Sequence, residues 1–224
     1  MKLYAFLPFI LQTIAWPIAH LILRINGKFI VHGKENLKGL KGPVIFAANH
    51  VNDLDPVITR AILPMFSILA PVFWVALYRK DYDKHAEEPF KGWRGLLYGD
   101  WFFRSWGAHP AIKGTGDYEQ SLQNHIQLLK DKQTVCIFPQ GGKAKYYGAE
   151  APVRGGVAFL SHHSGAPIVP IAISGTKGMT PYRLFVQKTH VEVHILPPVI
   201  IGGDVVDYKE EAQKIMDSIY KNFL

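Results

Sequence analysis

The distribution of apolar and polar residues along the chain predicts strands that alternate with helices. Short apolar runs bounded by glycine, proline or polar residues indicate buried strands, and longer segments with apolar residues three or four apart indicate helices. Strands are expected at residues 29–32, 44–48, 72–77, 107–114, 133–138, 167–173 and 191–201, and helices at 57–69, 93–106, 117–130, 153–164 and 208–223. This alternation is typical of an α/β fold with a mixed, largely parallel sheet flanked by helices.

The N-terminus differs from the rest of the chain because residues 3–23 carry no charge. This segment is barely long enough to cross a bilayer as a helix, and Pro8 and Pro17 interrupt it. A spanning helix and an interfacial or re-entrant helix both remain open, whereas a buried helix of a soluble protein is less favoured because no face is polar. We therefore expect residues 1–25 to form a membrane-anchoring helical segment and residues 26–224 to form a single α/β domain.

Composition narrows the range of partners. The chain has 224 residues with 48% hydrophobic content, which is enough for one domain with a full core. The net charge of +7 favours anionic partners such as phosphate-bearing molecules or anionic lipid surfaces. The lysines are dispersed and no nucleic-acid-binding motif accompanies them, so no nucleic acid is expected. The single cysteine, Cys136, lies in an apolar run and is interpreted as a buried strand residue.

The apolar run at residues 44–48 stops at a polar cluster that contains His50 and Asp55. Asp55 followed by Pro56 is a helix-start signal, so the two side chains are expected in a turn and not on one helix. A carboxylate held against an imidazole fixes the tautomer of the ring, and the other ring nitrogen can then take a proton from a substrate hydroxyl. The alternative is that Asp55 is only a helix cap and His50 only one of ten histidines.

A turn rich in glycine and lysine follows the strand predicted at residues 133–138. Such a turn can present backbone amides and ammonium groups to a phosphate. Together with Lys113 at another strand end, it is expected at the sheet edge where sites collect in parallel α/β folds. The candidate substrate contacts are Lys113, Gln140, Gly141, Gly142, Lys143, Lys145 and Arg154. No metal-ligand spacing stands out, so no metal is expected, and His162 and His163 are interpreted as surface or core residues.

Four sequence blocks occur in an order that is similar to a known family. They are His50-x-x-x-x-Asp55, the Phe138-Pro139-Gln140-Gly141-Gly142 turn, residues 165–173 and, in a weaker version, residues 107–113. Over residues 43–176 the chain resembles the lysophospholipid acyltransferases, typified by lysophosphatidate acyltransferase.

The resemblance implies a reaction of phospholipid biosynthesis at a membrane. A fatty acyl group would pass from acyl-CoA or acyl carrier protein to a hydroxyl of a lysolipid acceptor, with no other cofactor. His50 would act as the general base and Asp55 would orient it. Backbone amides of the glycine turn are expected to stabilise the oxyanion that forms on the thioester. The motif Gly-x-Ser-x-Gly is absent, which argues against a serine hydrolase. The chain is expected at a membrane, in contact with membrane lipids and with its site facing the cytoplasm.

Two positions depart from the family pattern. The family usually has glutamate where this chain has Gln140, and arginine near Lys113. Glutamine brings no negative charge, and lysine lacks the planar fork suited to phosphate. The acceptor is therefore open between a lysophospholipid and a lipid without phosphate. A membrane-surface binding protein with the same fold and a degenerate site is the second hypothesis, and the intact pair of His50 and Asp55 argues against it.

Overall fold

A seven-stranded sheet with the strand order β1-β7-β6-β2-β5-β3-β4 forms the centre of the protein. The computed structural model describes residues 2–25, 27–76, 100–112, 114–143, 152–180, 189–205 and 207–223. The strands are β1 Gly27–His32, β2 Val44–Ala48, β3 Val72–Ala76, β4 Ala108–Pro110, β5 Thr134–Ile137, β6 Ile168–Ser174 and β7 Thr189–Ile195. Neighbouring strands run parallel except for β6 and β7, which are antiparallel. The predicted mixed, largely parallel sheet is confirmed.

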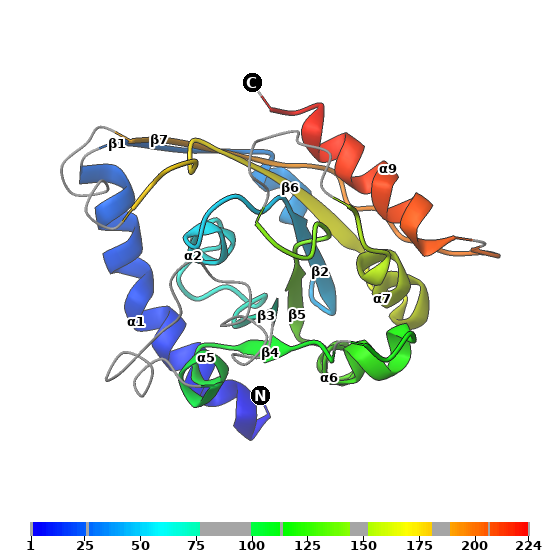
Figure 1. Ribbon diagram of the computed structural model, residues 1–224. Coiled ribbons are helices and arrows are strands. Elements are labelled where there is room, and N and C mark those ends of the chain that lie inside the picture. Colours follow the sequence, from blue (N-terminus) through cyan, green and yellow to red (C-terminus); the bar gives the residue numbers. More distant parts are fainter. Residues whose placement is uncertain are drawn as a thin grey trace.

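Helices cover both faces of this sheet (Figure 1). The helices are α1 Leu3–Ile25, α2 Asp55–Ala61, α5 Asp100–Ser105, α6 Tyr118–Lys130, α7 Gly156–Ser164 and α9 Tyr208–Tyr220, with a short 3-10 helix η1 at Lys34–Leu37. Residues of α2 and the end of α1 share one hydrophobic core with the sheet, and residues of α6, α7 and α9 share the other. The sheet is therefore the middle layer of three.

Strand β2 lies between β5 and β6 and is buried on both faces. Its side chains alternate between the two cores: Phe46 packs on the side of α2, and Ile45 and Ala47 pack on the side of α6, α7 and α9. A strand covered on both faces has to be apolar throughout, which explains the uninterrupted run in the sequence. Because β2 is central, the turn that follows it lies between the ends of its neighbours.

Several boundaries differ from the predicted ones. Helix α2 ends at Ala61 and not at residue 69, because Pro64 has no amide hydrogen with which to continue it. Strand β7 ends at Ile195 and not at residue 201, since two prolines follow, and Val199 forms only an isolated bridge. The strand predicted at residues 107–114 is reduced to β4. Residues 93–99 of the helix predicted at residues 93–106 lie outside the described residues, and α5 is helical from Asp100 to Ser105.

Helix α1 is attached to the rest of the protein through polar side chains. The amide of Gln12 donates to the carbonyls of Val72 and Trp106 at 2.8 and 2.9 Å and accepts from the Val72 amide at 3.0 Å. The indole of Trp16 donates to the carbonyl of Leu63 at 2.8 Å. The outward side of α1 carries exposed apolar residues, namely Leu3, Tyr4, Phe6, Leu7, Ile14, Ile18, Leu21 and Ile25. The helix is long and apolar enough to cross a membrane by length and composition.

Candidate active site

His50 and Asp55 meet in the turn between β2 and α2, as predicted. Nδ1 of His50 lies 2.9 Å from Oδ2 of Asp55. The Asp55 side chain is fully buried, while 17% of the His50 side chain is exposed to solvent. The structure therefore holds a buried carboxylate behind an imidazole that solvent or a substrate can reach.

The Asp55 carboxylate also fixes the shape of the turn. The same Oδ2 accepts hydrogen bonds from the amides of Val51 and Asn52 at 2.7 and 2.8 Å. The N-cap of α2 is Leu54, which makes no side-chain capping bond, and Asp55 is the first residue of the helix. The interpretation of Asp55 as a helix cap is therefore wrong. Its carboxylate holds the residues before the helix, including the one that follows His50.

Two asparagines that the sequence analysis missed complete this turn. The side chain of Asn49 accepts from the Ile173 amide at 2.7 Å and donates to the Ile173 carbonyl at 2.9 Å, which joins the end of β2 to β6. The side chain of Asn52 accepts from the Leu54 amide at 3.0 Å and donates to the carbonyl of Met179 at 2.8 Å. The sequence signal for these contacts is the presence of two asparagines between a predicted strand and a predicted helix, because asparagine side chains readily form hydrogen bonds with nearby backbone groups.

The segment after β5 supports His50 from the other side. The ring of Phe138 stacks on the imidazole with centroids 4.3 Å apart and an interplanar angle of 22°. Oε1 of Gln140 accepts from the backbone amide of His50 at 2.6 Å, and its Nε2 donates to the hydroxyl of Tyr220 on α9 at 2.9 Å. Gln140 is only 5% exposed. This side chain, expected to contact substrate, is occupied at both ends by the protein and positions His50.

The glycine turn lies beside the same loop. Gly141 has a φ of +68°, a conformation that favours glycine. A Cβ there would also meet the side chain of Arg154, which is exposed and would have to move. Its amide donates to the Phe138 carbonyl at 2.9 Å. Nζ of Lys143 lies 3.1 Å from the carboxylate of Asp53, an exposed pair that links this turn to the His50 turn.

The remaining predicted contacts divide into two groups. Gly142 and Arg154 are exposed, and the amide of Arg154 donates to the Pro139 carbonyl at 2.8 Å, which keeps it next to the glycine turn. Lys113 and Lys145 lie outside the described residues. Within the described ranges, one group of neighbouring metal-ligand residues is present, His32, Glu192 and His194, and it lies on β1 and β7.

A cavity of about 430 Å³ opens between α1, β1 and the segment that follows α2. Trp16, His20, Arg24 and Leu69 are among its lining residues, and none of the lining residues belongs to the His50 turn. This cavity is therefore separate from the histidine and carboxylate pair.

Comparisons with known proteins converge on one family. The sequence profile of the family described as Acyltransferase matches residues 28–174. A probable 1-acyl-sn-glycerol-3-phosphate acyltransferase of Mycoplasma pneumoniae is 23% identical, over 78% of this chain and 60% of that relative. The chloroplastic 1-acyl-sn-glycerol-3-phosphate acyltransferase BAT2 of Brassica napus is 22% identical, over 84% of this chain and 50% of the relative. This chain thus spans between half and two thirds of the length of these two relatives.

One further relative, which is a synthase, and one solved structure add to these matches. An N-acylphosphatidylethanolamine synthase of Arabidopsis thaliana is 25% identical, over 73% of this chain and 57% of that relative. The crystal structure of the 1-acyl-sn-glycerophosphate acyltransferase PlsC from Thermotoga maritima superimposes with a TM-score of 0.60. The match covers 96% of this chain and 76% of that structure at 16% identity, so it supports the fold.

Proposed function

The chain belongs to the acyltransferase family, and from this premise we propose that it transfers a fatty acyl group from an acyl thioester to a hydroxyl of a lysophospholipid-like acceptor. Acyl-CoA and acyl carrier protein are the donor classes that we propose. The observation that carries the proposal is the contact of 2.9 Å between Nδ1 of His50 and the buried carboxylate of Asp55.

This contact gives each nitrogen of the His50 ring a different task. With Nδ1–H donating to Asp55, the neutral ring keeps the lone pair of Nε2 free to accept a proton. The acceptor hydroxyl gives its proton to Nε2 while its oxygen attacks the thioester carbonyl carbon. The carbon–sulfur bond then breaks, and the thiolate of the donor takes the proton from the imidazolium. Between these two proton transfers, the buried negative charge of Asp55 stabilises the adjacent imidazolium.

The oxyanion that forms during this attack needs hydrogen-bond donors close to it. The amide of Gly141 already donates to Phe138. We therefore assign this role to the amide of Gly142, the next residue of the turn. The exposed side chains of Lys143 and Arg154 border the same turn and are proposed to contact a phosphate of the acceptor or of the donor.

The exposed apolar side of α1 suits an acceptor that resides in a membrane. Seven of its side chains are half or more exposed, among them Ile14 at 61%, Ile18 at 56% and Leu21 at 59%. The opposite side of the same helix is bonded to β3 and to the segment after α2. We propose that α1 lies in the membrane interface with its apolar side toward the lipid, and that it holds the active site near the lipid acceptor.

The proposal is tested with purified protein, labelled acyl-CoA and acyl carrier protein donors, and a panel of lysolipid acceptors, with products identified by mass. His50→Ala is expected to lower kcat by roughly 10²- to 10⁴-fold, the usual contribution of a general base. His163→Ala is the matched control, since His163 is exposed on α7. Transfer by the His50→Ala variant at the rate of the control would reject the mechanism. Absence of transfer by the wild-type protein to every acceptor would reject the activity.

A further inference from the structure

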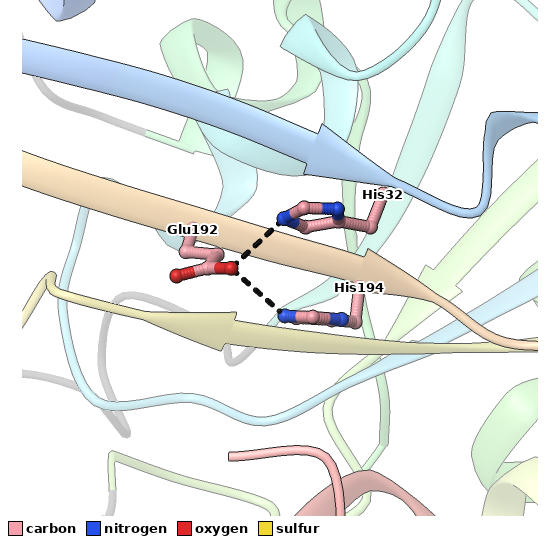
Figure 2. A group of neighbouring side chains, drawn as sticks. All are labelled: His32, Glu192 and His194. Atoms are coloured by element: carbon pink, nitrogen blue, oxygen red, sulfur yellow. Dashed lines mark hydrogen bonds and ion pairs between the residues drawn. The ribbon is translucent and has the colours of Figure 1, made fainter. Parts of the chain in front are cut away.

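His32, Glu192 and His194 converge on one point at the edge of the sheet (Figure 2). Strands β1 and β7 pair in parallel with His32 opposite His194. Glu192 precedes His194 by two positions, so its side chain lies on the same face of β7. Val191 and Val193, which alternate with these two residues along β7, point to the opposite face, where they are fully buried. Residues about 160 positions apart in the sequence are thereby brought together on the outer face of the two strands.

The three side chains are aimed at a common centre. Nε2 of His32 and Nε2 of His194 lie 2.8 and 3.2 Å from the same carboxylate oxygen, Oε1 of Glu192. The two imidazole rings are stacked, with centroids 4.6 Å apart and an interplanar angle of 20°. One ligand atom from each of the three residues lies within 4.8 Å of the other two.

These separations suit a tetrahedral metal site. Zinc binds imidazole nitrogen and carboxylate oxygen at about 2.0–2.1 Å, so neighbouring ligand atoms of a tetrahedron are about 3.3 Å apart. The separations of 2.8 and 3.2 Å in the structure are close to that value. Small rotations of the side chains would therefore place all three ligand atoms around one ion. Two imidazoles and one carboxylate also form a ligand set that zinc uses together with a water molecule.

We propose that His32, Glu192 and His194 bind a divalent transition-metal ion of the zinc class, with water as the fourth ligand. Imidazole ligands favour zinc, copper, nickel and iron over magnesium and calcium, which prefer oxygen ligands. The side chains of Glu192 and His194 are 20% and 22% exposed and that of His32 is 49% exposed, so an ion can enter from solvent. His190 lies nearby on the same strand, with Nε2 3.8 Å from the other carboxylate oxygen.

Such an ion would link the edge strand β1 to its only neighbour in the described sheet, β7. Strand β1 follows α1 in the chain and His32 is its last residue, so the ion would hold the end of β1 that is remote from α1. The site is distinct from the His50 turn, because β6 and β7 separate β1 from β2 in the strand order. The proposal therefore does not depend on the acyl-transfer mechanism.

The test uses the chain of residues 1–224, without a histidine tag, after removal of metal with EDTA. Addition of Co²⁺ is expected to give the visible absorption bands of a tetrahedral cobalt site, and Zn²⁺ in equimolar amount is expected to abolish them. Equilibrium dialysis with Zn²⁺ should give one bound ion per chain. The variants Glu192→Gln and His194→Ala should each weaken the affinity for Zn²⁺ by at least about 100-fold, since each removes a direct ligand.

Two controls keep this test decisive. His163→Ala removes an exposed histidine from α7 and is expected to bind Zn²⁺ with the affinity of the wild-type protein. Far-UV circular dichroism of each variant without metal verifies that it is folded. Wild-type protein that binds no Zn²⁺ at micromolar concentration would overturn the proposal. Folded Glu192→Gln and His194→Ala variants that both keep the wild-type affinity would also overturn it.

Discussion

Gln140 connects three parts of the chain through one side chain. It accepts from the His50 amide after β2, it follows β5, and it donates to Tyr220 on α9. Burial is the main cause that raises the pKa of Tyr220 above its usual value, so this hydroxyl stays protonated and can also act as a donor. Either glutamine or glutamate can therefore serve as the acceptor for His50 at this position.

This arrangement predicts different outcomes for two substitutions of Gln140. Gln140→Ala leaves the His50 amide without its acceptor, which is expected to lower the free energy of unfolding by about 1–3 kcal/mol. It should also lower kcat by about 10- to 100-fold, because small displacements of a catalytic group are costly. Gln140→Glu should retain most of the free energy of unfolding and most of kcat, since a carboxylate can accept hydrogen bonds from the His50 amide and from the Tyr220 hydroxyl.

Urea denaturation and acyl-transfer kinetics measure these effects. Tyr220→Phe is the control that removes only the bond remote from His50, and it is expected to change stability by about 1 kcal/mol with kcat nearly unchanged. A Gln140→Ala variant with the kcat of the wild-type protein would show that the bond to the His50 amide does not position the ring.

At the residue scale, the sequence predicted the pair of His50 and Asp55 because both belong to one short turn after an apolar run. It could not predict the contacts of Gln140, because they depend on the placement of α9 some 80 residues later. It also could not predict that His32, Glu192 and His194 converge. His32 is far from Glu192 and His194 in the sequence, and only the parallel pairing of β1 with β7 brings them together.

At the scale of elements, α6 is joined to β4 through a buried histidine. His125 is fully buried, and its Nε2 lies 3.1 Å from the carbonyl oxygen of His109. Burial, and then the nearby His109, lower the pKa of His125 from 6.5 to about 4. Burial, and then Arg104, lower the pKa of His109 as well. Both rings are therefore neutral in the folded protein at neutral pH.

These lowered pKa values predict a loss of stability in mild acid. The unfolded chain protonates His125 near pH 6.5, whereas the folded protein does so only near pH 4. Protons then bind preferentially to the unfolded state between these values, so the free energy of unfolding falls as the pH falls from about 6.5 to about 4. The expected contribution of His125 is of the order of 3 kcal/mol, and it is fully regained above pH 6.5.

Urea denaturation between pH 7 and pH 4.5 measures this dependence. His125→Gln is the matched variant, because its amide can still donate to the His109 carbonyl but does not titrate in this range. The difference in stability between wild type and variant should shift in favour of the variant as the pH falls. A constant difference across the range would contradict a lowered pKa for His125.

Element boundaries were predictable where a local signal marks them. Asp117 caps α6 through a bond to the Glu119 amide at 2.9 Å, and the helix starts where the aspartate predicted it. The predicted end of α2, residue 69, lies eight residues beyond the observed end at Ala61, because the apolar residues up to Leu69 continue the helical pattern. Ile62, Leu63 and Leu69 are instead buried in irregular structure beneath α1, whereas Phe66 and Ile68 are exposed. Arg60 donates to the Met65 carbonyl in this segment at 2.8 Å. Burial alone does not distinguish these two conformations.

At the scale of the whole molecule, the order of strands and helices predicted a layered α/β fold, and the sheet confirms it. The attachment of α1 was not predictable, since Gln12 pairs with the backbone of Val72 across 60 residues. These bonds also change how the membrane contact should be tested. Deletion of residues 1–25 would leave the amide and carbonyl of Val72 without their partners, so loss of binding after deletion could reflect unfolding.

Substitutions on the outward side of α1 avoid that difficulty. Ile14, Ile18 and Leu21 are exposed and are spaced along one side of the helix, so lysine at these positions disturbs no internal contact of the core. Full burial of one such side chain contributes about 1.5–3 kcal/mol, and lysine removes this gain. The double variant Ile14→Lys and Ile18→Lys should therefore weaken binding to phospholipid vesicles by at least about 10-fold in a sedimentation assay, even though the added positive charge favours anionic lipid.

Ile200→Lys provides the matched control, because Ile200 is 62% exposed and adjoins Ile201, whose amide donates to Ser161 on α7. It is expected to bind vesicles like the wild-type protein. Trp101→Lys tests another exposed apolar side chain, since Trp101 on α5 is 63% exposed and α5 contacts α1. If the α1 double variant bound normally while Trp101→Lys did not, α5 and not α1 would be the membrane contact. Normal binding by both variants would place the contact elsewhere and contradict the proposed orientation of the protein at the membrane.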